Sequence, residues 1–223
     1  MNPRQQELAA RIAGPRGAVR GPFRVWLHSP QMCERAESRG AFARFDCDLP
    51  KHLRELVLLM AARNWDAQYS WNAQVHQAIE AGIPEAAVKA VAEKREAVFD
   101  DEADQVFYQF CREVLDNHFV SDETFARALE HFGPKGLVDT IGALADFTML
   151  GMCLNTFQVD LQADREPPSP TSAATSVSSP AGTDRGRDGP RPWCAYGASP
   201  RASAGRQRSR AWTSTCTPAK CTR

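Results

Sequence analysis

The polar side chains best suited to chemistry lie along one predicted helix, between residues 64 and 82. At about 100° per residue, one narrow stripe of that helix is apolar and is expected to be buried: Ala67, Trp71, Val75, Ala78 and Gly82. Gln74 lies about 60° from Trp71 at the edge of this stripe, and Ser70 follows on the same side. Both side chains therefore border the core, where we expect a pocket.

Three other side chains of this helix, Tyr69, Asn72 and His76, cluster on the opposite face. Histidine titrates near neutral pH, so His76 is a candidate acid or base by residue type. Its place on the outer face predicts a solvated surface histidine instead. Helical geometry thus favours Gln74 as the pocket residue, although an amide does not exchange a proton near neutral pH.

The helix predicted before it runs from Pro50 to about Asn64 and carries Glu55. Apolar side chains surround this glutamate on both sides of the helix, and a helix that is apolar all round is buried. A buried carboxyl group must be paired, or its pKa is raised. Two interpretations stay open: an ion pair with an arginine such as Arg63 or one near Arg54, and a site in which Glu55 is the acid and base.

Helical patterns cover the rest of the body without a strand pattern, so the predicted fold class is all-α. The other expected helices are 3–13, 29–45, 84–96, 100–117, 121–132 and 134–161. Ser29 is expected to cap the second of these, with Pro30 in its first turn. Residues 22–27 are expected to pack as an extended arm. Trp65 and Trp71 are interpreted as core residues rather than as a platform for a ligand.

The charge is unevenly divided along the chain. Residues 1–165 hold 18 Lys and Arg against 24 Asp and Glu, a net charge of −6, whereas 166–223 hold 9 against 3, a net charge of +6. The acidic helical body is a poor binder of nucleic acid. Asp139, Asp146 and Asn155 interrupt its long apolar last helix, so we do not expect a membrane span.

The four cysteines of the body form no Cys-x-x-Cys pair and no metal-ligand spacing. The polar N-terminus lacks the apolar stretch of a secretory signal. These features predict a reduced, cytoplasmic setting.

The segment 166–223 contains no Leu, Ile, Phe or Met. Such a chain buries too little apolar surface to offset the entropy of ordering, so we predict a disordered basic tail. Its Ser, Pro, Arg and Gly, with isolated Trp and Cys, are typical of a GC-rich reading frame translated out of register. A frameshift product and a true disordered tail are both open hypotheses, and resequencing the DNA distinguishes them.

A set of short motifs runs from Glu55 to Gly82: Arg54-Glu55, Ala62-Arg63, Trp65, Tyr69-Ser70-Trp71 and Ala81-Gly82. In these residues the chain resembles the carboxymuconolactone decarboxylase superfamily, which includes the AhpD-like alkylhydroperoxidases, and in particular its decarboxylase-like branch. The resemblance extends more loosely from Gly21 to about Asp160. It implies that residues 1–165 form a compact multi-helix AhpD-like bundle.

The peroxidase branch of that superfamily uses two cysteines and a histidine after the glutamate. Counted from Glu55, these positions hold Ala67, Ser70 and Gln74. Hydroperoxide reduction of that kind needs one thiolate to attack and a second thiol to resolve. The sequence therefore disfavours thiol peroxidase activity.

The resemblance implies a lyase, without a cofactor or metal, that acts on a small carboxylated, lactone-type metabolite of aromatic degradation. In this interpretation Glu55 is the acid and base, Gln74 and Ser70 orient the substrate, and Tyr69 and Trp71 shape a pocket between helices 51–64 and 67–81. His76 is a displaced substitute base.

The resemblance also implies a homo-oligomer, a trimer or hexamer, with a small-molecule substrate and with no nucleic acid or membrane as partner. An alternative is a non-catalytic small-molecule-binding or structural oligomer that lost its chemistry with the histidine.

Overall fold

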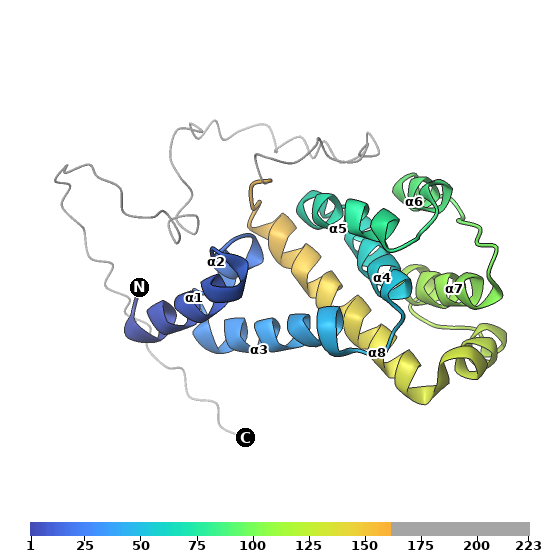
Figure 1. Ribbon diagram of the computed structural model, residues 1–223, viewed down its shortest axis with the longest axis horizontal. Coiled ribbons are helices and arrows are strands. Elements are labelled where there is room, and N and C mark those ends of the chain that lie inside the picture. The colour runs from blue at the N-terminus through green and yellow to red at the C-terminus, as the bar shows by residue number, and fades with distance from the viewer. Residues whose placement is uncertain (162–223) are drawn as a thin grey trace, which may run out of the picture.

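The computed structural model describes residues 1–161, which form eight α-helices and one π-helical segment and contain no strand (Figure 1). The elements are α1 (Pro3–Arg16), α2 (Pro22–Trp26), α3 (Pro30–Ala41), η1 (Phe42–Asp46), α4 (Lys51–Asn64), α5 (Gln68–Glu80), α6 (Glu85–Ala92), α7 (Glu102–Asn117) and α8 (Asp122–Thr156). The all-α prediction is confirmed. The predicted tail, 166–223, lies outside the described residues.

The long helix α8 runs diagonally through the molecule and separates two groups of helices (Figure 1). One group, α1 to α3, packs on the C-terminal part of α8 and shares a core with it that includes Leu8, Ile12, Leu27 and Cys153. The other group, α4 to α7, forms the larger core, in which α4 contacts α5, α7 and α8. The fold thus places η1 and α5 on either side of α8.

Helix α4 is buried on every side, as its sequence predicted. All residues from Glu55 to Arg63 are buried, including both of these charged side chains. Since a buried charged group requires partners, the neighbours of Glu55 and Arg63 decide what each of them does.

Helix α8 consists of two helical parts joined at Gly133, whose φ of 63° and ψ of 175° are not helical. Pro134 follows directly, and proline lacks the N–H that would continue the ladder. This break matches the predicted end of one helix and start of the next. The helix is long and apolar enough to cross a membrane by length and composition alone, and 56% of its most apolar window is buried inside the protein.

Two local expectations are wrong. Residues 22–26 form the short helix α2 rather than an extended arm, because Pro22 opens a helical turn after Gly21. Ser29 stands at the start of α3, but its side chain makes no capping hydrogen bond. The caps of α7 and α8 do form, through Asp101 and Ser121.

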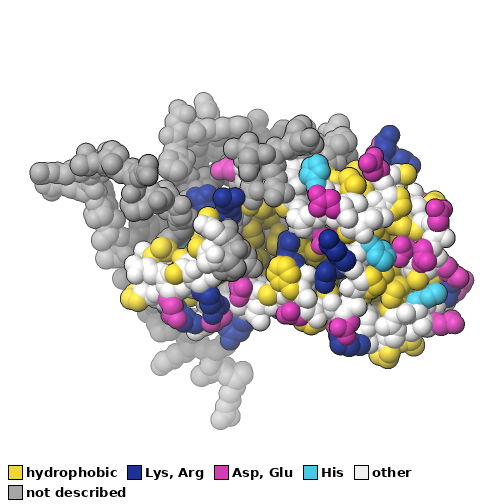
Figure 2. Space-filling view, viewed as in Figure 1, with side chains coloured by type: hydrophobic (Ala, Val, Ile, Leu, Met, Phe, Trp, Pro, Cys, Tyr) yellow, Lys and Arg dark blue, Asp and Glu magenta, His cyan; other side chains and the backbone are white. Residues whose placement is uncertain are grey.

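Acidic and basic side chains are interspersed on the face of the described residues that Figure 2 shows. Ion pairs join helices of the described chain, such as Arg4 with Glu34 at 2.9 Å and Arg127 with Glu102 at 3.1 Å. Exposed pairs of this kind contribute little to stability, typically below about 1 kcal/mol.

Candidate functional site

A cavity of about 580 Å³ lies between α2, α3, η1, α5 and α8. Its wall is mostly apolar and aromatic, with a small number of polar groups that converge from three helices. The lining residues include Phe23, Trp26, Glu37, Arg44, Phe45, Tyr69, Ser70, Gln74, Asp146, Phe147 and Leu150. This size and this mixture are typical of a site for a small organic molecule.

Helix α5 supplies the polar floor of the cavity. Ser70 and Gln74 are one helical turn apart, are 2% and 1% exposed, and both line the cavity. The helix ends at Glu80, and two residues later Gly82 has a left-handed φ of 104°, which suits glycine. The predicted placement of these two side chains at the border of the core is confirmed.

Glu55, Gln74 and Arg44 form a hydrogen-bonded row. The Gln74 amide is oriented by its neighbours, since only one orientation gives both of its atoms a partner. In that orientation Gln74 Nε2 donates to Glu55 Oε2 at 3.0 Å, and Gln74 Oε1 accepts from Arg44 Nη2 at 2.8 Å. A fixed amide thus links a buried carboxyl group to a cation at the cavity.

Burial raises the pKa of Glu55 above its usual range, and the positive charges of Arg44 and Arg54 oppose this rise. Glu55 itself does not line the cavity in the described chain. Gln74 stands between the two, so a substrate in the cavity meets the amide and not the carboxyl group.

Arg44 is held from two directions. The segment η1 carries it at the end of α3, and its guanidinium carbon lies 5.0 Å from the ring centroid of Phe147 on α8. A cation over an aromatic face is attracted by the ring, by about 0.5 to 2 kcal/mol. With Gln74 below and Phe147 beside it, Arg44 presents a fixed positive charge to the cavity.

Asp146, next to Phe147 on α8, is a buried acid in the lining of the cavity. It is 2% exposed, its Oδ1 makes no hydrogen bond, and this atom forms an ion pair with Arg39 Nη2 at 3.4 Å. Burial raises the pKa of Asp146, while Arg39 and Arg44 oppose the rise. Ser70 Oγ is likewise buried without a hydrogen-bond partner.

The N-terminal part of the chain closes the cavity opposite α5. Gly21 has a φ of 55°, and a Cβ there would lie 2.8 Å from the phenol oxygen of Tyr69. Glycine is therefore required twice, for its backbone conformation and for this close approach. Phe23 and Trp26 then pack edge to face at 5.6 Å and form the aromatic wall.

Of the other predicted site residues, Tyr69 lines the cavity, whereas the exposed His76 and the buried Trp71 do not. Trp71 is part of the larger core, as one expectation had it, so its predicted place in the pocket wall is wrong for this cavity. Trp65 is 37% exposed, which contradicts its assignment to the core. Asn72 was expected on the outer face and is buried instead.

The position of the cavity also differs from the expectation. A pocket between the helices 51–64 and 67–81 was predicted, but no residue of α4 is among the described lining residues. The space between α4 and α5 is filled by packed side chains, and the cavity lies on the other side of α5. Of the two ion-pair partners considered for Glu55, Arg63 bonds the Ala92 carbonyl and Asp66 instead, whereas Arg54 acts on Glu55 through its charge.

Sequence reasoning did not single out Arg44 and Asp146. Asp146 was noticed only as a polar interruption in an apolar helix, and that interruption was the signal of a buried acid. Arg44 gave no signal of its own, since it lies among other charged residues in the predicted helix 29–45.

The cysteines of the described residues are buried and lie outside the cavity lining. Burial raises the pKa of Cys33 and of Cys153 to about 11, which disfavours the reactive thiolate. The described residues also contain no group of three or more His, Cys, Asp or Glu that could hold a metal ion.

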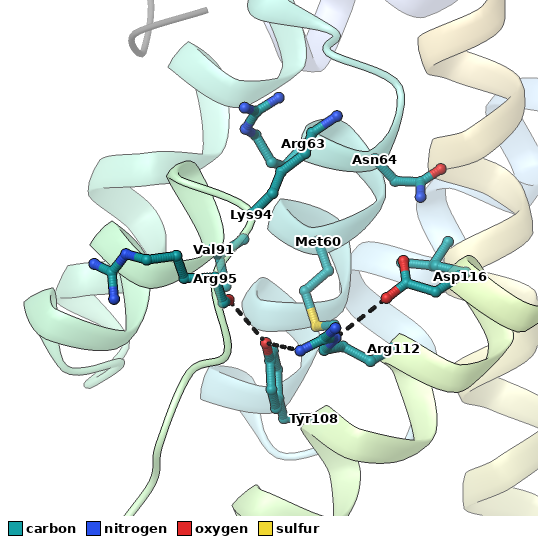
Figure 3. A pocket seen from close by; sticks show the side chains of 10 residues that line it. Met60, Arg63, Asn64, Val91, Lys94, Arg95, Tyr108, Arg112 and Asp116 are labelled. Carbon is teal, nitrogen blue, oxygen red and sulfur yellow. Dashed lines mark hydrogen bonds and ion pairs between the residues drawn. The ribbon is translucent and has the colours of Figure 1, made fainter. Parts of the chain in front are cut away.

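A second, smaller pocket of about 180 Å³ lies between α4, α6 and α7 (Figure 3). It is lined by four cations, Arg63, Lys94, Arg95 and Arg112. Each of them has an acidic partner: Asp66 for Arg63 and Lys94, Glu93 for Arg95, and Asp116 for Arg112. Figure 3 shows the Arg95 guanidinium pointing away from Arg112.

The sequence matches no protein-family model and none of the curated proteins. Two solved structures share its arrangement of helices. One is ATU0492 from Agrobacterium tumefaciens, a protein of unknown function assigned provisionally to the antioxidant defence protein AhpD. It is 13% identical, with a TM-score of 0.55 over 63% of this chain and 97% of that one.

The other is a variant of the debrominase Bmp8 in complex with 2,3,4-tribromopyrrole, also 13% identical. The TM-score is 0.58 over 72% of this chain and 87% of that one. At this identity the similarity concerns the fold alone. The chain thus has the AhpD-like helical fold that its sequence predicted.

Proposed function

We propose that this protein is an enzyme, without a cofactor of its own, that acts on a small carboxylated or lactone-type ring compound in the cavity between α5 and α8. The observation that carries the proposal is the row Glu55–Gln74–Arg44, which fixes one positive charge at the polar end of an aromatic cavity. The reaction is a lyase reaction of the decarboxylase type.

The chemistry of such a reaction matches a fixed cation. The bond between the ring carbon and the carboxyl carbon breaks, carbon dioxide leaves, and the electron pair passes to an enolate oxygen. Arg44 is positioned to stabilise that developing negative charge, and a preorganised charge in a partly enclosed cavity acts more strongly than one in bulk water. The carbon then takes a proton from solvent.

Glu55 has a supporting role in this proposal. It does not line the cavity, so it acts through Gln74, whose amide it orients by accepting a hydrogen bond. The oxygen of the oriented amide then accepts a hydrogen bond from Arg44. Glu55 is thus a positioning residue, while Arg44, Gln74 and Ser70 are the groups that would meet the substrate.

The small, flat shape of the ligand is inferred from the aromatic side chains of the cavity and from a solved structure of the same fold. The rings of Phe23, Trp26 and Phe147 suit a flat ring compound. The debrominase of the same fold is seen with tribromopyrrole, which is also a small flat ring.

The test uses turnover of γ-lactone carboxylates, followed by release of carbon dioxide, with the wild type, Glu55→Gln and Glu55→Ala. We expect Glu55→Gln to keep KM within about threefold and to lower kcat about tenfold, because a misplaced Arg44 stabilises the enolate less well. Glu55→Ala should lower kcat further. Equal kcat values in all three proteins would remove Glu55 from the proposal.

A second candidate function is binding without chemistry. Two observations favour it: the superfamily histidine is replaced by Gln74, and no described residue of the row can both touch the substrate and exchange a proton near neutral pH. Calorimetry with benzoate, an aromatic carboxylate, separates the two. Binding of benzoate by a protein that turns over no lactone carboxylate, together with activity gained in Gln74→His, identifies the binding protein.

We also propose that the chain forms a homo-oligomer, a trimer or hexamer, through the outer face of α8. Val138, Ile141 and Met152 lie on one face of this helix and are 71%, 42% and 47% exposed. Large exposed apolar side chains in a row are typical of an interaction surface. Light scattering should give a multiple of the chain mass for the wild type and a monomer for Val138→Asp; a monomeric wild type would contradict the proposal.

A further inference from the structure

Two oxygens of the cavity are left without hydrogen bonds inside the protein. Ser70 Oγ on α5 and Asp146 Oδ1 on α8 are both buried, both belong to cavity-lining residues, and neither has a hydrogen-bond partner. Buried polar atoms without partners are rare in folded proteins, since each costs about 1 to 3 kcal/mol. Two in one cavity therefore indicate a ligand that would satisfy them.

The surroundings of Asp146 fix its carboxyl group. Gly40 on α3 leaves room for it, since a Cβ at Gly40 would lie 3.4 Å from Asp146 Oδ2. Arg39 contacts Oδ1 at only 3.4 Å, and the Arg39 side chain is half exposed, so this pair is loose. Arg44 is anchored by Gln74 and Phe147, and its positive charge also acts on Asp146. Asp146 Oδ1 therefore has no close hydrogen-bond donor among the described residues.

We infer that Asp146, with Ser70, forms a second recognition point that accepts a hydrogen bond from a hydroxyl group on the ring of the ligand. The substrate class is thus a hydroxylated cyclic or aromatic acid: its acidic oxygen faces Arg44, and its hydroxyl faces Asp146. This inference rests on the proposed function for the acidic end of the ligand and adds the polar group at the other end.

The alternatives for Asp146 fit less well. Its ion pair with Arg39 is too long and too exposed at one partner to explain a buried acid, because a buried charge needs close partners to offset its desolvation. The other acid in the described lining, Glu37, has a side chain that is 22% exposed, so water can satisfy it even though its ion pair with Arg11 is as long as 3.8 Å. Asp146 is thus the one fully buried carboxylate among the described lining residues.

The experiment compares ligands on the unaltered full-length protein. Calorimetry measures the Kd of benzoate, of the three hydroxybenzoate isomers and of the three methoxybenzoates. A methoxy group occupies the same place but donates no hydrogen bond. We expect at least one hydroxy isomer to bind about tenfold more tightly than benzoate, because its hydroxyl donates to a charged acceptor. The matching methoxy compound should show no such gain.

The variants Asp146→Asn and Ser70→Ala locate the effect. Asp146→Asn should lose most of the gain from the hydroxyl while its benzoate affinity stays within about threefold, and Ser70→Ala should lose a smaller part. If benzoate binds but no hydroxy isomer binds more tightly, the inference about Asp146 is overturned and the proposed function stands. If Asp146→Asn keeps the full gain, the inference is likewise overturned. If none of the seven compounds binds, the proposed function fails and the inference fails with it.

Discussion

The cavity beside α5 and the pocket between α4, α6 and α7 are both rich in charge, but they differ in how that charge is satisfied. In the smaller pocket every cation has an acid, and Arg63 also donates to the Ala92 carbonyl at 2.6 Å. In the cavity, Ser70 Oγ has no hydrogen-bond partner and Asp146 has only an ion pair with the half-exposed Arg39 at 3.4 Å. A pocket whose cations all have acidic partners is part of the scaffold, whereas poorly paired buried groups in an open cavity indicate a site.

The smaller pocket shows this closure in detail. Tyr108 accepts a hydrogen bond from the Ala97 N–H at 3.0 Å and donates to the Arg95 carbonyl at 3.3 Å. Arg112 Nε donates to Asp116 at 3.2 Å (Figure 3). The two Tyr108 bonds tie the loop after α6 to α7, and the Arg112 bond lies within α7. An anion entering this pocket would have to displace bonds that already exist.

The largest effect is expected from breaking the closed pocket. Arg63→Met removes a buried cation that holds Asp66 and the Ala92 carbonyl, and should lower the free energy of unfolding by about 3 kcal/mol. Urea denaturation measures it. Lys89→Met, on the exposed side of α6, is the control and should stay within about 0.5 kcal/mol. A loss below about 1 kcal/mol for Arg63→Met would contradict the structural role of this pocket.

The next effect concerns binding and separates the two regions directly. Arg44→Gln should weaken benzoate binding about 10- to 100-fold, because a charge-assisted hydrogen bond to the carboxylate is lost. Arg112→Gln, in the closed pocket, should leave the Kd of benzoate within about twofold. Calorimetry on both variants checks this. An equal loss of benzoate affinity in the two variants would show that Arg44 is not the specific anion-binding arginine.

The same substitution at two aspartates, Asp66 and Asp146, should change the free energy of unfolding by a smaller amount and in opposite directions. Asp66→Asn should lower the free energy of unfolding by about 1 to 2 kcal/mol, since Arg63 and Lys94 lose their partner. Asp146→Asn should be neutral or stabilising by up to about 1 kcal/mol, because it removes a poorly paired buried charge. A destabilisation of Asp146→Asn as large as that of Asp66→Asn would place Asp146 in the scaffold.

The smallest effect is a pH dependence of the row beside the cavity. The folded pKa of Glu55 is raised above 4.5, so the folded state binds the proton more tightly than the unfolded chain does. Its contribution to stability is present below pH 4.5 and is lost as the pH rises through the raised value. Wild type should therefore become less stable relative to Glu55→Gln between pH 4.5 and about 7.5.

Glu113 is the control for that titration, because its shift has the opposite sign. Its hydrogen bond from Thr124, together with the Ser121 N–H, lowers its pKa to about 2. Its contribution is thus complete above pH 4.5 and is lost only as the pH falls toward 2. The stability difference between wild type and Glu113→Gln should be constant between about pH 5 and 7.5. Two results would contradict these assignments. One is a wild type that becomes more stable relative to Glu55→Gln as the pH rises. The other is a stability difference between wild type and Glu113→Gln that changes between about pH 5 and 7.5.

The fold was predictable because apolar periodicity, proline and glycine mark most helices of the body. Helix α5 could be phased well enough to place Gln74 and Ser70 at the core and His76 outside it. Arg44 and Asp146 could not be found in this way, because they line the same cavity only through the way in which η1 crosses α8. Periodicity describes one helix at a time and does not report which neighbouring helix faces it.

The π-helical segment η1 has a consequence for how the polar end of the cavity can change. In Phe42–Asp46 the backbone accommodates one residue more than a continuing α-helix would, and Cys47 bonds back to the Phe42 carbonyl at 3.0 Å. Removing Phe42 or Ala43 would turn Arg44 about 100° away from Gln74. The number of residues before Arg44 thus sets where its charge points, so an insertion or deletion at this position would alter ligand binding without changing any side chain of the cavity.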